Sequence, residues 1–459
     1  MSEVLKALRA ALGDDAVIAG PALAARATSY WDAAPTRARA LVRPRDTAEV
    51  SRTLAICHAH DQPVVTQGGL TGCVAGAVAG AGEVILSLER MNAIEAIDPL
   101  GATATVQAGV TLQAVQEAAR SHELLFALDL GARGSCTIGG NVATNAGGIN
   151  VLRYGMMRHL VLGLEAVLAD GTVISSLNRM LKNNAGYDLK QLLIGTEGTL
   201  GVVTRVVLRL HPLPVSCDAA LVAVDSFERV TALLAHMQRE LAGTLSAFEV
   251  MWNAYYRAAT EAGGHRAAMG REHPFYVLLQ AEGADPAGDA ARFSRLLEAA
   301  LEAGLIVDAV IPQSVGERRA LWAVRENFEA MLAGRPTFLY DVSLPVSAMA
   351  AYAEAVQAAC AARWPQGRCI VFGHIADGNV HLFVQPGDAA ATHADSDAIV
   401  YAPLAGCEGS VSAEHGIGTE KIGWLSRSRS AAEVDLMRLL KRSLDPKNLL
   451  NRGRVLPPP

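Results

Sequence analysis

Short hydrophobic runs, several of them alternating with polar residues, recur through the first 212 residues, a pattern typical of β-strands. Asp46 followed by Glu49 has the spacing of a capping box and predicts a helix that continues through Cys57. Asp170-Gly171 follows one strand and predicts a hairpin. The predicted strands are 64–66, 84–88, 103–108, 161–168 and 202–210. This part is therefore predicted to be strand-rich and punctuated by glycine.

After Pro214 the pattern changes, because glycines become rarer and strand-like runs alternate with alanine-rich helical segments. Such alternation predicts an α/β or α+β layer. A second change falls near residue 408, before a last helix and a proline-rich tail. The strand-like runs of the middle part are 221–224, 275–280, 307–311, 338–342 and 370–374. We expect three segments, 1–213, 214–408 and 409–459, with no internal repeat.

The composition is that of a folded protein with more than one domain. The chain has 459 residues, 51% of them hydrophobic and 19% charged, which excludes a disordered chain. The net charge is −6 and no block of five like charges occurs, which disfavours nucleic-acid and anionic-membrane partners. No apolar run reaches the ~20 residues of a membrane span, and no leader pattern is present. We therefore expect a soluble, cytoplasmic protein.

The cysteines indicate a reducing compartment. There are seven, an odd number, and they are scattered without any CxxC pair. This arrangement argues against a disulfide framework and against a thiolate zinc site. Buried structural thiols are the expectation.

Many of the 42 glycines gather in two clusters, at 67–80 and at 131–148. Glycine lets successive backbone N–H groups converge on an anion such as a pyrophosphate, because no Cβ blocks the approach. A pair of tight turns is the alternative interpretation. Neither cluster matches a Walker loop, and neither matches GxGxxG opening a helix, which disfavours a nicotinamide Rossmann domain.

Two further motifs complete a pattern with these clusters: Gly186-Tyr187-Asp188-Leu189-Lys190-Gln191-Leu192 and Gly195-Thr196-Glu197-Gly198-Thr199-Leu200-Gly201. Together with the GGLTG loop and the IGGN segment, they resemble the FAD-binding vanillyl-alcohol oxidase and p-cresol methylhydroxylase superfamily. Within it, they resemble the branch of D-lactate and D-2-hydroxyglutarate dehydrogenases, and the likeness covers nearly the whole chain. The resemblance implies an α+β protein. Its parts would be a two-subdomain FAD-binding domain, an α+β cap domain for the substrate with an antiparallel sheet, and a C-terminal segment returning to the FAD domain.

The resemblance also implies a non-covalently held FAD, because Thr71 stands where covalently flavinylated members have histidine. Asn451 would lie near the isoalloxazine ring. The residues implied to bind FAD are Gln67, Gly68, Gly69, Leu70, Thr71, Gly72, Asp129, Ser135, Ile138, Gly139, Asn141, Thr144, Asn145, Gly147, Gly148, Glu197, Gly201, Val202, Val203 and Asn451.

His374 and His381 stand seven residues apart around an Asp-Gly-Asn turn. A hairpin there would bring both imidazoles to one side, facing a single ion; a histidine pair without metal is the alternative. Two histidines and one carboxylate leave open positions on Zn²⁺, as catalytic sites require. The resemblance implies that His374, His381 and Glu414 bind a divalent metal, with zinc expected and Mn, Fe or Co also suited to this set.

The resemblance assigns two catalytic roles. His415 would be the base that takes the hydroxyl proton, and Arg325 would bind the substrate carboxylate with its rigid fork. A metal on the hydroxyl oxygen lowers its pKa, and the flavin accepts the hydride. Without the resemblance, the expected interpretation of Arg325 is a solvated arginine on the surface of a helix.

Three pocket positions depart from the hydroxyglutarate-oxidising members: Glu329 replaces a threonine, Leu339 a lysine and Phe383 an asparagine. A second substrate carboxylate would lose its partners and meet Glu329, and an unpaired buried charge is strongly disfavoured. The prediction is therefore a monocarboxylic D-2-hydroxy acid with an apolar or aromatic side chain, such as D-lactate or D-mandelate.

Several alternatives stay open. Other residues could replace the missing contacts, leaving D-2-hydroxyglutarate as the substrate. The chain could instead be a flavin electron-transfer subunit without a substrate of its own, or an oxidase that uses O₂. An electron-transfer flavoprotein or quinone as electron acceptor, and a homodimer, are expected from the resemblance alone.

Overall fold

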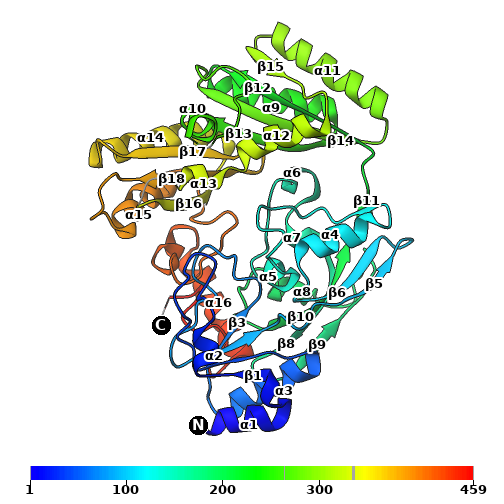
Figure 1. Cartoon of the computed structure of the whole chain (residues 1–459), viewed down its shortest axis with the longest axis vertical. Helices are drawn as coiled ribbons and strands as arrows, with labels where there is room; N and C mark the ends of the chain where they lie inside the picture. The colour runs from blue at the N-terminus through cyan, green and yellow to red at the C-terminus, as the bar shows by residue number, and fades with distance from the viewer. Residues whose placement is uncertain (1, 263, 333–335, 458–459) are drawn as a thin grey trace. The chain divides into compact units, whose positions relative to one another are not determined.

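The computed structural model describes residues 2–262, 264–332 and 336–457 (Figure 1). Its backbone contacts divide the chain into two compact units. The first unit comprises residues 1–148, 155–213 and 414–459, and the second comprises 149–154 and 214–413. The fold is α+β, as the sequence predicts.

The first unit begins with a small sheet in the order β1-β2-β4-β3, in which β2, β4 and β3 are parallel. Helix α3 (Thr47–Ala59) connects β2 to β3, and the Asp46 carboxylate accepts a hydrogen bond of 2.8 Å from the Glu49 amide. This contact confirms the predicted helix start. The strands are β1 (Val17–Ile18), β2 (Ala40–Val42), β3 (Val64–Gln67) and β4 (Val84–Ser87).

An antiparallel sheet in the order β5-β6-β10-β8-β9 forms the other half of this unit. Its three central strands are buried at nearly every position, which indicates that both faces of the sheet are covered. The turn at 170–171 joins β8 to β9 as a hairpin, as predicted. The strands are β5 (Ile94–Asp98), β6 (Thr103–Gln107), β8 (Val161–Val167), β9 (Val173–Ser176) and β10 (Val202–Arg209), with α4 (Leu112–Arg120) and α5 (Ile138–Ala143) as neighbouring helices.

The C-terminal segment belongs to the first unit, and one buried lysine anchors it there. Lys441, on α16 (Ala431–Leu444), donates to the Thr199 carbonyl at 2.8 Å, the Leu450 carbonyl at 2.8 Å and the Asp445 carboxylate at 2.6 Å. The chain then runs beside β3, since the Val64 amide donates to the Leu449 carbonyl. The predicted return of this segment to the FAD domain is therefore observed.

The second unit is built on a seven-stranded sheet in the order β15-β12-β14-β13-β17-β18-β16, and every pairing is antiparallel. This topology decides between the two predicted layer types in favour of α+β. The strands are β12 (Ser216–Val224), β13 (Leu245–Trp252), β14 (Phe275–Gly283), β15 (Asp308–Val310), β16 (Phe338–Ser343), β17 (Arg368–His374) and β18 (Asn379–Gln385). The main helices are α9 (Phe227–Leu241), α11 (Pro286–Glu302), α12 (Val315–Arg325), α14 (Met349–Arg363) and α15 (His393–Tyr401), as labelled in Figure 1.

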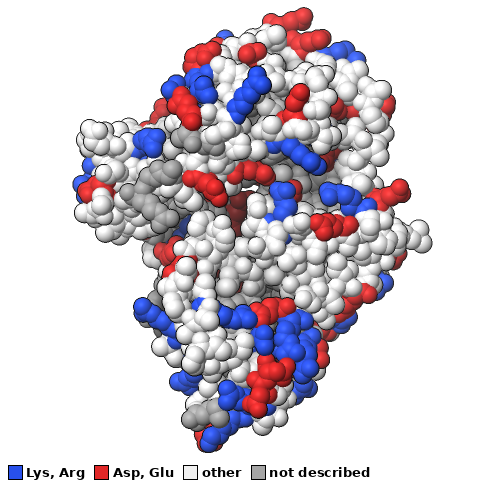
Figure 2. Space-filling view, viewed as in Figure 1, with Lys and Arg blue, Asp and Glu red and all other residues white. Residues whose placement is uncertain are grey.

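The surface carries both charge signs. On the face shown in Figure 2, basic and acidic side chains are interspersed, in keeping with the small net charge. Among the described helices, none has the length and apolar character required to span a bilayer. Each of the seven cysteines is a free thiol.

Candidate active site

The two glycine clusters, which are far apart in the sequence, lie against each other in the first unit. A Cβ on Gly69 would stand 2.0 Å from the Ser135 carbonyl oxygen, so no side chain fits there. A Cβ on Gly68 would likewise stand 2.4 Å from the Thr137 hydroxyl. Glycine is therefore required here so that the loop after β3 can approach the loop before α5.

Buried polar atoms beside this contact fit a polar cofactor. Thr66 Oγ1, Thr137 Oγ1 and Asn141 Nδ2 are buried and have no hydrogen-bond partner within the described part of the chain. Buried polar groups are nearly always paired, so these atoms call for ligand or water partners. Thr137 Oγ1 lies between the two glycine loops, 2.4 Å from the place of a Cβ on Gly68 and 3.4 Å from that of one on Gly140, and loops so rich in backbone amides suit the pyrophosphate and ring system of FAD.

The other residues predicted to bind FAD lie around the same loops. Gln67 is the last residue of β3, and the residues up to Gly72 form the loop after it. Ser135 to Asn145 span the residues before α5, the helix itself and the two residues after it. Gly201 to Val203 lie at the start of β10. Several of these side chains form hydrogen bonds or ion pairs within the protein. Thr144 donates to the Gly140 carbonyl at 3.1 Å, Asn145 Oδ1 accepts from the Arg158 amide at 2.9 Å, and Asp129 pairs with Arg133 at 2.8 Å. These contacts fix the shape of the loops.

Glu197 is part of this framework too. Its carboxylate accepts hydrogen bonds from the Ile417 amide at 2.7 Å and the Gly418 amide at 2.9 Å. Its carbonyl accepts from Asn451 Nδ2 at 2.6 Å, while Asn451 Oδ1 accepts from the Thr66 amide at 2.9 Å. Burial raises the pKa of Glu197, although the two amides act to lower it. Glu197 thus holds the segment that follows His415.

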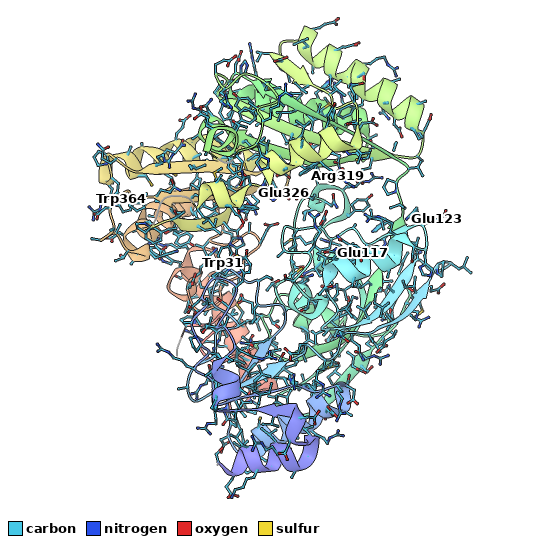
Figure 3. All side chains as sticks on the ribbon, in the orientation of Figure 1. Trp31, Glu117, Glu123, Arg319, Glu326 and Trp364 are labelled. Atoms are coloured by element: carbon cyan, nitrogen blue, oxygen red, sulfur yellow. The ribbon has the colours of Figure 1, made fainter. Side chains whose placement is uncertain are left out.

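Replacing Glu197 with alanine is expected to destabilise the protein by at least about 2 kcal/mol, because two backbone amides lose their acceptor. Glu123→Ala is the matched control, since Glu123 also has a positive φ (58° against 52°) but is exposed (Figure 3). Chemical denaturation of FAD-loaded protein measures both variants. Equal stability of the two variants would contradict an anchoring role for the carboxylate.

In the second unit, His374 and His381 lie on the β17–β18 hairpin, joined by a single 3-10 turn, Ile375–Asp377. Their ring centroids are 5.4 Å apart. The predicted hairpin therefore brings the two imidazoles together. Residues directly opposite on neighbouring antiparallel strands face the same side of a sheet, so strand register decides what surrounds them.

Each histidine faces a carboxylate on the adjacent strand. Glu249 on β13 is directly opposite His374, and its Oε1 lies 2.6 Å from His374 Nδ1. Asp341 on β16 is directly opposite His381, and its Oδ1 lies 3.8 Å from His381 Nδ1. Histidines that bind metals usually donate their second ring N–H to a carboxylate, which orients the ring. The contact of Glu249 with His374 has this pattern, whereas the 3.8 Å between Asp341 Oδ1 and His381 Nδ1 exceeds the length of a hydrogen bond.

Asp341 also fixes the end of the unit. Its Oδ2 accepts from the Ser412 hydroxyl at 3.2 Å and from the Ala413 amide at 3.1 Å. The next residue, Glu414, begins the last segment of the first unit. Of the residues predicted to bind the metal, His374 and His381 lie in the second unit, where they offer two imidazoles to a divalent ion, whereas Glu414 belongs to the first unit, as His415 does.

Arg325 enters the same face from the end of α12, the helix that also carries Arg319 and is followed by Glu326 (both labelled in Figure 3). It is 2% exposed, so it is not a solvated helix arginine. Its Nε donates to Glu249 Oε2 at 2.8 Å, and its Nη2 lies 2.7 Å from the same oxygen. The guanidinium also stands 4.6 Å from the centre of the Phe372 ring.

Phe372 joins this arginine to a group of aromatic rings. Phe372 stacks on Phe383 at 5.6 Å and on His381 at 4.9 Å, and Phe328 meets Phe372 edge-on at 5.9 Å. Leu339 lies directly opposite Phe383 and packs on the same apolar cluster. Glu329, on α13 (Phe328–Met331), is exposed. Of the three departures from the hydroxyglutarate pattern, Leu339 and Phe383 thus lie on the site's face of the sheet.

Sequence reasoning did not identify Glu249. The available signal is a lone carboxylate in the otherwise apolar run Leu245–Trp252, since a fully buried acid almost always has a charged or polar partner. Asp341 and Phe372 were also missed as parts of the site.

The fold and the glycine cradle define a flavoprotein oxidoreductase. The description "FAD binding domain" matches residues 38–176, and "FAD linked oxidases, C-terminal domain" matches residues 213–455. The chain belongs to this family of FAD-linked oxidases and, within it, to the branch of the D-lactate and D-2-hydroxyglutarate dehydrogenases. The resemblance inferred from the motifs is confirmed.

Several curated proteins are more than a third identical to this chain over the aligned residues. It is 40% identical to the mitochondrial D-2-hydroxyglutarate dehydrogenase of Bos taurus, over 91% of this chain and 77% of that protein. It is 39% identical to the D-2-hydroxyglutarate dehydrogenase of Xanthomonas citri, over 93% and 90%. A putative mitochondrial D-lactate dehydrogenase of Schizosaccharomyces pombe is 35% identical, over 89% and 80%.

Solved structures support the fold. p-Cresol methylhydroxylase with substrate bound has a TM-score of 0.78 at 18% identity, covering 99% of this chain and 96% of that one. The 4-ethylphenol oxidase of Gulosibacter chungangensis has a TM-score of 0.76 at 17% identity, covering 99% and 97%.

Proposed function

We propose that the protein oxidises a D-2-hydroxy acid to the 2-oxo acid, using FAD and a divalent metal. The observation that supports this most is the row of groups on one sheet face: a buried arginine, two histidines and their carboxylates. An arginine suits a carboxylate, and a metal between imidazoles suits the neighbouring hydroxyl oxygen. A redox carrier without a substrate would need neither.

Each group has a role in this reaction. Arg325 binds the C1 carboxylate and so orients the α-carbon. His415 takes the proton of the hydroxyl group as the C–O double bond forms, and the α-hydrogen leaves with its electron pair as hydride. FAD, held by the loops at 67–72 and 135–148, supplies the hydride acceptor. A divalent metal held by His374, His381 and Glu414 would lower the pKa of the hydroxyl group.

The relatives' names favour D-2-hydroxyglutarate as the substrate. Two residues support the monocarboxylate instead, because Leu339 and Phe383 offer an alkyl group and a ring on the site's face, where a second carboxylate would need donors. The exposure of Glu329 weakens the argument that it repels a diacid. D-2-Hydroxyglutarate is therefore the first candidate, and an apolar or aromatic monocarboxylate the second.

The test is a panel of D-2-hydroxyglutarate, D-lactate and D-mandelate, read anaerobically by bleaching of the FAD absorbance in metal-replete protein. The first candidate predicts a kcat/KM for the diacid at least about tenfold above the others, the effect of one well-paired charge. Preference for D-lactate or D-mandelate would establish the second. Absence of bleaching by all three, with FAD bound, would refute the proposed reaction and support an electron-transfer subunit.

The electron acceptor, the assembly and the location are also proposals. We propose an electron-transfer flavoprotein or quinone as acceptor, a homodimer, and zinc as the metal. A cytoplasmic location is proposed from the sequence, although two of the relatives named above are described as mitochondrial. Peroxide production with and without an artificial acceptor would test the remaining alternative of direct oxidation by O₂.

A further inference from the structure

Glu249 joins the two halves of the proposed substrate site. It is 1% exposed and lies in the middle of β13, between the strands β14 and β17. One carboxylate oxygen contacts His374 Nδ1 at 2.6 Å, and the other contacts Arg325 Nε at 2.8 Å and Nη2 at 2.7 Å. A single side chain thus touches both the proposed metal ligand and the proposed carboxylate-binding residue.

The contact with Glu249 sets the orientation of the histidine ring. Glu249 Oε1 lies 2.6 Å from His374 Nδ1, so the Nδ1 edge of the ring is held against the carboxylate. Nε2, the other ring nitrogen, is therefore turned away from Glu249, the orientation needed for metal binding through Nε2.

The arginine is also oriented by this contact. Both of its short distances to Glu249 involve the Nε–Nη2 edge, and the Phe372 ring covers the guanidinium at 4.6 Å. The Tyr255 hydroxyl donates to the Arg325 carbonyl at 2.5 Å, which fixes the end of α12. The guanidinium is therefore held in one orientation before any substrate arrives, which reduces the entropy lost on binding.

We propose that Glu249 is a positioning residue that orients His374 for metal binding and Arg325 for carboxylate binding at once. The proposal rests on the proposed function, and it adds a residue and a physical link to that site. If Glu249 merely stabilised the fold, its replacement would have no specific effect on metal affinity or on substrate binding. A positioning role and a stabilising role therefore predict different results across the variants.

The test compares E249Q with R325K and with E165Q. Glu165 is the matched control, because it is a buried carboxylate in the first unit that accepts from the Thr47 and Thr204 hydroxyls and lies 3.6 Å from Arg205 Nη1. Zinc affinity is measured by competition with a chromophoric chelator, and KM and kcat by anaerobic FAD bleaching. Thermal unfolding reports the folding of each variant.

We expect E249Q to bind zinc roughly 10- to 100-fold more weakly, as for other carboxylates behind metal histidines, and to raise KM at least about tenfold. R325K should raise KM while zinc affinity stays within about threefold, and E165Q should change neither. E249D keeps the charge but is one methylene shorter, so its carboxylate should reach only one of the two partners and should impair only zinc affinity or only KM. E249D replaces E249Q in the test if E249Q does not fold.

The outcomes separate the two proposals. If the wild type is active and folded E249Q keeps its zinc affinity and KM, the proposed role of Glu249 is refuted and the proposed function is not. Equal losses in E249Q and E165Q would show a general stabilising role and overturn it too. A wild type that neither binds zinc nor is bleached by a D-2-hydroxy acid would refute the proposed function itself.

Discussion

Replacing His415 with asparagine is expected to slow FAD reduction by a D-2-hydroxy acid roughly 10²- to 10⁴-fold, the usual contribution of a positioned acid–base group. The hydroxyl proton must leave as the α-hydrogen departs, and an amide cannot accept it at neutral pH. Because no contact predicted for FAD involves the imidazole, the flavin should stay bound. Stopped-flow bleaching of metal-replete protein measures the rate, and the FAD absorbance of desalted protein measures occupancy.

His122→Asn is the control for this variant. His122 lies in the first unit, as His415 does, and its ring is exposed, with Nδ1 3.0 Å from the Ala118 carbonyl oxygen. It should reduce FAD at the wild-type rate. If the His415→Asn protein reduces its flavin at the wild-type rate, His415 is not the base of this reaction. If the variant loses FAD, His415 has a role in cofactor binding.

The local features of the fold could be predicted from the sequence. The capping contact of Asp46 with Glu49 and the hairpin that pairs His374 with His381 involve residues close together in the chain. The residue types in a turn and the spacing of hydrophobic positions are sufficient to predict such local features. The glycine clusters were also identified, although their mutual contact was not, since Gly69 and Ser135 meet only in the folded chain.

The environment of the histidines could not be predicted, because it depends on strand order. Glu249 precedes His374 by 125 residues, and the two are opposite only because β13 pairs with β17. Asp341 meets His381 through the pairing of β16 with β18. The same applies to Glu329, because α12 ends at Arg325 and Glu329 lies on the separate helix α13, where its side chain is exposed. Sheet topology, which the sequence pattern left open, supplies this information.

Removing the metal is expected to lower the rate of FAD reduction at least about 100-fold without releasing FAD. A metal on the hydroxyl oxygen contributes several kcal/mol to the transition state, and each 1.36 kcal/mol is tenfold in rate. Treatment with a chelator, followed by desalting, gives the metal-free protein, and its metal content is measured by mass spectrometry. Titration with Zn²⁺, Mn²⁺ and Co²⁺ should then restore activity with about one equivalent of the preferred ion.

His374→Ala removes the same metal by mutation, and His393→Ala is its control. The His393 ring lies 2.7 Å from Asp397, a histidine–carboxylate pair like that of His374 and Glu249, but it lies on α15 and is 44% exposed. The control should keep both its metal and its rate of FAD reduction. Full activity in a His374→Ala protein with far less than stoichiometric metal would contradict metal assistance. The hydroxyl proton would then have to be removed by His415 without help from a metal.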